Sequence, residues 1–129
     1  MRRERGFSLI EVLIAFLILT FVITMSLAAF VERTRRLQQA SEMILAYQAL
    51  GNEAEYRRRM DYSSLEAQPV AFVSDTVLLE PLTPFGTAVK VDPAGNGLKT
   101  VTLTIRWRNG EREARLALVR ADTGGSNLW

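Results

Sequence analysis

The chain has no cysteine and no histidine among its 129 residues. These two absences exclude disulfide scaffolds, zinc sites built on Cys or His, nucleophilic catalysis by Cys–His or Ser–His–Asp groups, and haem held by histidine. The remaining Asp and Glu residues form no recognisable acid–base pair. We therefore expect no catalytic residues, no metal site and no cofactor, and a protein that is not an enzyme.

Charge and helix breakers are missing from one long segment. Between Phe7 and Val31 the only ionisable residue is Glu11, and Val12–Val31 contains no proline and no glycine. At ~1.5 Å per residue a helix over Val12–Val31 spans ~30 Å, the thickness of the hydrocarbon core of a bilayer. The segment is apolar on every face, unlike an amphipathic surface helix. The sequence therefore predicts a transmembrane helix over residues 7–31, with the lipid bilayer as a partner.

A cleavable secretory signal is the alternative interpretation of this segment. Ser26-Leu27-Ala28 has the small–x–small pattern of a cleavage site. The apolar region, however, is nearly twice the usual length for such a signal, and it contains Glu11. We therefore favour the membrane helix.

The acidic residue inside the apolar run needs a physical reason. A carboxylate within a transmembrane segment costs roughly 2.5–3.5 kcal/mol on insertion scales, so such residues are usually paired and functional. Glu11 also lies about one turn into the segment, where its side chain can reach the headgroups by snorkelling. Position alone does not choose between these two interpretations, so the surrounding residues decide.

The residues around Glu11 resemble the class III signal sequence of type IV prepilins and of the pseudopilins of type II secretion. A short basic leader ends in Gly6, the aromatic Phe7 follows, Glu11 stands four residues later, and the apolar run continues unbroken. In that family a membrane prepilin peptidase cuts after the glycine, and the new amino terminus is methylated. The resemblance implies a leader peptide of residues 1–6, cleavage between Gly6 and Phe7, and N-methylation of Phe7.

The same resemblance implies an assembly role for Glu11. Cleavage before Phe7 creates a cationic amine at the edge of the bilayer, and in a stack of helices this amine comes from the adjacent subunit. At ~4 Å the two charges attract strongly enough to offset part of the cost of removing a carboxylate from water. An unpaired Glu11 has no such compensation, so the pair is expected to set the register between neighbours.

Function, partners and location follow from the resemblance as expectations. It implies a minor pilin or pseudopilin, a structural subunit of a type IV pilus or related filament. The implied partners are the prepilin peptidase/N-methyltransferase, other pilin or pseudopilin subunits and the inner-membrane assembly platform. The leader is expected in the cytoplasm and the C-terminal domain across the inner membrane, in the periplasm or on an extracellular pilus. The lack of Gly and Pro in the span, and of Cys, favours a minor subunit over a major one.

Charge is spread unevenly along the chain. Residues 61–92 carry about −4 and residues 99–120 about +4, while the net charge is only +2. The pI of 9.4 reflects a small excess of Arg over carboxylates, so no nucleic acid is expected as a partner. The patches of opposite sign fit lateral contacts with neighbouring subunits as well as they fit a solvated surface.

Two alternatives to the interpretation as a filament subunit stay open. Within the family, the chain fits a type II secretion or competence pseudopilin, and the residues do not separate these systems. Outside it, the chain fits a single-pass membrane-anchored binding module whose domain acts alone. The second alternative predicts an intact Met1, or a cut after Ala28, and no self-association.

The helix is expected to continue beyond the membrane over residues 32–62 as an amphipathic element. Apolar residues recur there at helical spacing, and we expect this stripe to pack against a sheet. The stripe consists of Leu37, Ala40, Ile44, Tyr47 and Ala54. Gly51-Asn52 offers a site for an interruption, because Gly suits a helix end and Asn a new start. The run Arg57–Arg59 is interpreted as a complement to the helix macrodipole rather than as a phosphate site.

The remainder, residues 63–129, is expected to form a small β-rich domain with a flexible tail over residues 121–129. Short strands are predicted at Val70–Leu79 and Thr87–Val91. The strongest pattern is Lys99–Arg120, where apolar and polar residues alternate on both sides of Asn109-Gly110. Asn-Gly between two such runs predicts a hairpin with a type I′ turn.

A domain of this size cannot bury much core by itself, so its sheet should pack on the helix. The predicted fold class is α+β and pilin-like, a long N-terminal helix packed against a small antiparallel sheet. The loop Asp92–Gly97 has oxygen ligands but not the spacing of a calcium loop, and we interpret it as a turn.

Overall fold

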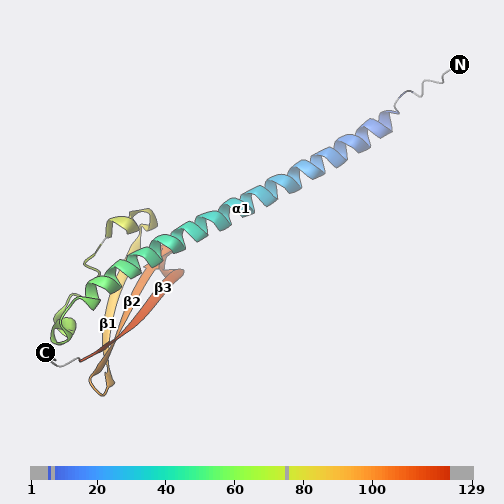
Figure 1. Cartoon of the computed structure of the whole chain (residues 1–129). Coiled ribbons are helices and arrows are strands. Elements are labelled where there is room, and N and C mark those ends of the chain that lie inside the picture. Colours follow the sequence, from blue (N-terminus) through green and yellow to red (C-terminus); the bar gives the residue numbers. More distant parts are fainter. Residues whose placement is uncertain (1–5, 7, 75, 123–129) are drawn as a thin grey trace. The chain divides into compact units, whose positions relative to one another are not determined.

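A computed structural model describes residue 6 and residues 8–74 and 76–122 of the chain. It divides into two compact units, Met1–Gln39 and Ala40–Trp129, each of which is considered by itself. The elements are the helix α1 (Leu9–Arg58), the 3₁₀ helices η1 (Tyr62–Ala67) and η2 (Thr76–Leu82), the strands β1 (Phe85–Gly95) and β2 (Leu98–Trp107), the turn η3 (Arg108–Gly110) and the strand β3 (Arg112–Ala121) (Figure 1). A long N-terminal helix and a small antiparallel sheet confirm the predicted α+β, pilin-like fold class.

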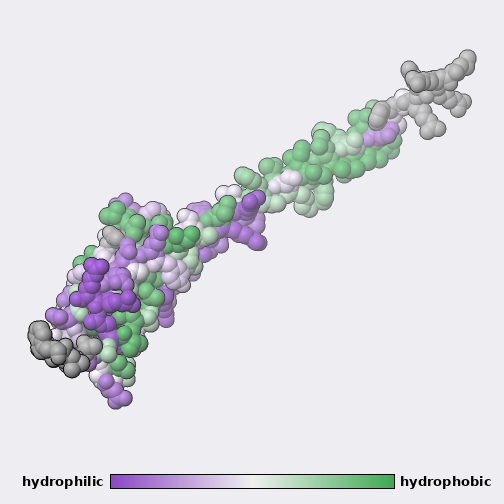
Figure 2. Space-filling model, viewed as in Figure 1, coloured by the Kyte–Doolittle hydropathy of each residue, from purple (hydrophilic) through white to green (hydrophobic). Residues whose placement is uncertain are grey.

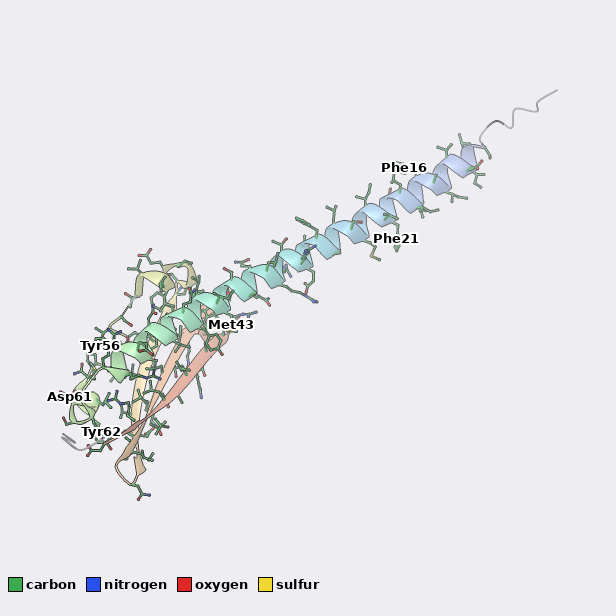
Figure 3. The ribbon with its side chains drawn as sticks, in the orientation of Figure 1. Phe16, Phe21, Met43, Tyr56, Asp61 and Tyr62 are labelled. Atoms are coloured by element: carbon green, nitrogen blue, oxygen red, sulfur yellow. The ribbon has the colours of Figure 1, made fainter. Side chains whose placement is uncertain are left out.

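The first unit contains the apolar part of α1. Among the described residues, α1 is the helix long and apolar enough to cross a membrane, judged by length and composition. Its large side chains are exposed, and Phe16 and Phe21 project away from the helix axis (Figures 2 and 3). Exposed apolar area costs ~25 cal/mol per Å² in water, so this surface requires lipid or other helices around it.

The second unit is built on a three-stranded antiparallel sheet in the order β1-β2-β3. Val101, Leu103 and Ile105 of β2 are fully buried, as the alternation predicts. Leu103 lies opposite Val89 of β1 and Leu116 of β3, so one face of all three strands contributes to the core. The Lys99–Arg120 hairpin is thereby confirmed.

The face of α1 that enters this core differs from the predicted stripe. The buried helix residues are Ala46, Ala49, Leu50, Glu53 and Arg57. By contrast four of the five residues of the predicted stripe are exposed and only Ala54 packs against the core, so the expectation that the stripe as a whole packs against the sheet is wrong. Side-chain size at the contact sets how closely elements approach, and the small alanines permit an approach that Ile44 and Tyr47 would block.

A buried ion pair lies on this helix face. Glu53 and Arg57 have almost no exposed surface, and Arg57 Nε donates to Glu53 Oε1 at 2.7 Å. Glu53 Oε2 accepts hydrogen bonds from the Val73 and Ser74 N–H groups at 3.1 and 3.0 Å and from Ser74 Oγ at 2.7 Å. Buried charges are tolerated when paired and hydrogen-bonded, and here they fasten the chain after η1 to the helix.

Removal of one member of this pair should be costly. We expect Glu53→Gln to lower the free energy of unfolding by about 3–5 kcal/mol at pH 7, because it leaves the Arg57 charge buried without its partner. Glu55→Gln is the matched control, since Glu55 pairs with Arg58 on the exposed surface, where such pairs contribute at most about 1 kcal/mol. Denaturant unfolding of the full chain in detergent measures both. Equal losses in the two variants would contradict the role of the buried pair.

The same carboxylate makes stability depend on pH. Burial alone would raise the pKa of Glu53, but the hydrogen bonds from Ser74, Arg57 and Val73 outweigh it and hold the pKa below its ordinary value. A depressed folded pKa stabilises the protein above the unfolded pKa of ~4.3, and this stabilisation is lost as pH falls through the folded pKa. We expect unfolding free energies to fall below about pH 4, less steeply in Glu53→Gln than in the wild type.

One predicted strand is replaced by other structure. Of Val70–Leu79, the described part before residue 75 forms no strand, and Thr76 onward belongs to η2. The segment covers the edge of β1 instead, because Val89 N–H donates to Val70 O at 2.5 Å and Phe72 N–H donates to Thr87 Oγ1. The predicted strand Thr87–Val91 lies within the longer β1.

Of the two predicted turns, Asp92–Gly97 is confirmed at Asn96-Gly97, although Asp92–Gly95 belong to β1, and the other turn differs. Trp107 pairs with Arg112, so the predicted two-residue turn at Asn109-Gly110 is wrong and the connection runs over residues 108–111. Arg108 Nη2 donates instead to Glu42 Oε1 at 2.6 Å, which holds Arg108 out of the strand register. The two-residue connection occurs at Asn96-Gly97, whose positive φ angles of 52° and 71° fit a type I′ turn.

The last turns of α1 are continuous, and an arginine of β3 donates hydrogen bonds to backbone carbonyl oxygens at the C-terminal end of the helix. The helix passes through Gly51-Asn52 without interruption. Arg120 of β3 donates to the carbonyl oxygens of Arg58 and Met60, which have no partner within the helix. The interpretation of Arg57–Arg59 as a complement to the helix macrodipole is wrong for Arg57, which forms the buried ion pair with Glu53.

Candidate functional site

The signal residues lie at the beginning of α1. Gly6 is exposed, whereas Phe7, residues 1–5 and residues 123–129 lie outside the described residues. The predicted flexible tail over residues 121–129 is wrong at its start, because Ala121 belongs to β3 and Asp122 N–H donates to Gly97 O. Glu11 N–H donates to Ser8 O at 2.9 Å, and α1 begins at Leu9, three residues after Gly6. Cleavage between Gly6 and Phe7, and methylation of Phe7, stay predictions.

Glu11 occupies the first turn of α1. The unpaired N–H groups of a helix start favour a negative charge there. Its side chain is exposed, and no ion pair joins it to another of the described residues. The carboxylate is therefore presented outward at the start of an apolar helix, where a cation from another chain can reach it.

A groove follows along the apolar helix. It measures ≈ 500 Å³, and its lining consists of Leu13, Phe16, Leu17, Thr20, Phe21 and Thr24. Thr20 Oγ1 donates to Phe16 O and Thr24 Oγ1 donates to Thr20 O, both at 2.8 Å. Because these hydroxyls are satisfied within the helix, the groove presents an apolar surface suited to the ridge of another helix.

In the second unit the stripe around Ile44 is a second exposed apolar surface. It forms a shallow groove of ≈ 520 Å³ lined by Ala40, Met43, Ile44, Tyr47 and Gln48. The sequence predicts this stripe to be apolar, but it does not show which face of α1 packs against the sheet, because the face that is buried carries the charged residues Glu53 and Arg57. In the second unit, α1 therefore has one face buried in the core and a second, exposed apolar face that a partner can contact.

The described residues include no group of three or more His, Cys, Asp or Glu side chains that could hold a metal ion. The residues buried together in the second unit are an ion pair and apolar side chains, among them Trp107 and Phe72. Their arrangement fits a structural role, since the hydrogen bonds of Glu53 and Arg57 join α1 to the chain at residues 69–74.

Comparison with known proteins gives one match. The prokaryotic N-terminal methylation motif matches residues 1–27, which include Gly6, Phe7, Glu11 and most of the apolar run. The match confirms the resemblance to type IV pilin-like proteins, and it indicates a membrane-anchored structural subunit rather than an enzyme. Such a signal implies processing by a prepilin peptidase and assembly with other pilins. No curated protein and no solved structure matches the chain.

Proposed function

We propose that the chain is a minor pilin or pseudopilin, a subunit of a type IV pilus or related filament that assembles through its N-terminal helix. The observation that carries this proposal is the outward-facing carboxylate of Glu11 in the first turn of an exposed apolar helix. That helix begins at Leu9, within the segment that the methylation motif matches. A carboxylate in such a place is costly unless another molecule supplies its counter-charge.

Processing supplies that counter-charge. A prepilin peptidase cuts between Gly6 and Phe7 on the cytoplasmic side of the inner membrane, and Phe7 is then methylated. The new amine of one subunit pairs with Glu11 of the next, and the helix surfaces then cover one another. The C-terminal domain lies on the other side of the membrane, and the inner-membrane assembly platform moves the subunit from the bilayer into the filament.

The proposal is tested by shearing filaments from cells that make the tagged chain. We expect the shortened chain in the sheared fraction together with other pilins. Recovery of the chain from membranes alone, as a monomer, would contradict assembly and favour a membrane-anchored binding module.

The stripe around Ile44 provides a further prediction. Ile44→Glu should reduce incorporation into filaments at least about tenfold, because burying an unpaired carboxylate between helices costs more than 1.4 kcal/mol. Val119→Glu is the matched control, since Val119 is 62% exposed and Ile44 58%. The sheared fraction measures both variants. Equal incorporation of Ile44→Glu and wild type would show that the stripe is not part of the assembly surface.

A further inference from the structure

The outer face of the sheet carries a hollow that the helix-based assembly does not use. It measures ≈ 420 Å³, and we call it the outer-face hollow. Its lining consists of Gly86, Thr87, Ala88, Lys90, Thr102, Thr104, Arg106 and Arg115. Most of these residues alternate along the strands with the buried ones, so the hollow opens away from the core. Small residues on β1 make it concave.

The outer-face hollow is rich in donors and in positive charge. Arg106 Nε and Arg115 Nε both contact the carboxylate of Glu113, and this pairing holds the pKa of Glu113 below its ordinary value. A guanidinium has five N–H donors, so one shared carboxylate leaves most donors of these two arginines for another acceptor. Lys90 adds a third cation, which contacts Asp92. The lining itself contains no acidic residue, and its threonine hydroxyls add further donors.

An acidic projection lies elsewhere on the same unit. Glu80 of η2 is exposed, and no hydrogen bond or ion pair within the described part of the chain engages its carboxylate. Val77, one turn earlier on η2, is among the most exposed apolar residues of the unit. Figure 2 shows hydrophobic atoms on the surface at η2. The projection therefore combines an unpaired carboxylate with an apolar side chain.

We propose that η2 of one copy seats in the outer-face hollow of a second copy, with Glu80 bound by Arg115 and Arg106 and with Val77 against Ala88. Charge complementarity favours this occupant, because η2 combines the Glu80 carboxylate with the exposed apolar side chain of Val77, and the hollow combines surplus arginine donors with the small side chain of Ala88. A contact between two different surfaces repeats from copy to copy and generates an open chain rather than a closed dimer. This inference rests on the proposed filament role and names a second contact between its subunits.

Disulfide cross-linking in membranes tests the contact, and the absence of natural cysteines leaves only the introduced ones to react. Two full-length variants, Val77→Cys with one tag and Ala88→Cys with another, are produced together and oxidised. A disulfide requires Cα atoms about 4.4–6.8 Å apart, so we expect the mixed pair to cross-link and each variant alone to give little product. Equal yields from the mixed and single variants, or no product at all, would overturn the contact.

Charge reversal then tests the pairing itself. We expect Glu80→Arg and Arg115→Glu, each added to the cross-linking pair, to lower the mixed product roughly tenfold, and the two together to restore it. Glu111→Arg is the control, because it reverses an exposed acid outside both surfaces. Failure of the combined reversal to restore the product would overturn the assignment of Glu80 to the hollow.

The same samples separate this inference from the proposed function. A shortened, filament-incorporated chain without cross-links would overturn the η2 contact and leave the proposed function standing. A chain that keeps its leader would overturn the proposed function, and a mixed cross-link in that chain would still show the η2 contact between copies.

Discussion

A Glu11→Val chain is expected to lose its leader normally and to be missing from filaments. Valine fits the apolar helix, so membrane insertion should not suffer: a carboxylate costs roughly 2.5–3.5 kcal/mol at the centre of a membrane helix, and less within reach of the headgroups. The amine of the neighbouring subunit, however, loses its partner. Two unit charges at ~4 Å attract by ~4 kcal/mol at an effective dielectric of about 20, and desolvation removes part of this. We expect incorporation to fall at least about tenfold, measured in the sheared fraction.

The control for this variant is Thr20→Val. Thr20 is also a polar residue of the apolar run, but its hydroxyl is bound to Phe16 O of its own helix. We therefore expect normal cleavage and normal incorporation for Thr20→Val. If Glu11→Val entered filaments as well as Thr20→Val did, the intermolecular pairing of Glu11 would be wrong.

A Gly6→Leu chain is expected to remain uncut. Glycine has no side chain, so an extended backbone enters a protease cleft without a clash, and leucine fills the space beside the scissile bond. Only the precursor, heavier by the mass of residues 1–6, should be found by mass spectrometry. Because the leader then stays attached, no amine forms at Phe7, and this variant should also be absent from filaments.

Two glycine variants serve as controls for Gly6→Leu. Gly6→Ala adds the smallest side chain at the same place and should be cut more slowly than wild type but still be cut. Gly51→Ala lies in the helix with no atom within 4 Å of the added Cβ, so it should be processed at the normal rate. A Gly6→Leu chain as short as the wild type would show that the cut falls elsewhere.

The parts of the fold that the sequence predicted are those with strong periodicity. The apolar run predicts the first part of α1, because an uncharged segment of this length and hydropathy fits few structures other than a membrane helix. The alternation of apolar and polar residues around Leu103 predicts β2 and the burial of one of its faces. These patterns depend on single elements, so one sequence is enough to recognise them. The methylation motif was recognisable for the same reason, since its residues are contiguous.

The parts that were missed depend on which elements meet. Glu53 and Arg57 look like surface residues until Ser74 and the preceding chain are placed beside them. Their burial in turn displaces the apolar stripe, so Ile44 is exposed although it is more hydrophobic than its buried neighbours on α1. The segment at Val70 has a strand-like composition, but its Val73 N–H donates to Glu53 of that network, and its Val70 O accepts a hydrogen bond from Val89 at the edge of β1. Tertiary contacts therefore override local preference at these places.

If cleavage supplies the counter-charge for Glu11, the mature protein must begin at Phe7, so its amino terminus is the decisive observation. Intact-mass analysis and N-terminal sequencing of the chain purified from its own membranes or filaments provide this measurement. We expect a chain that begins at a methylated Phe7. A chain that begins at Met1, or after Ala28, would contradict it.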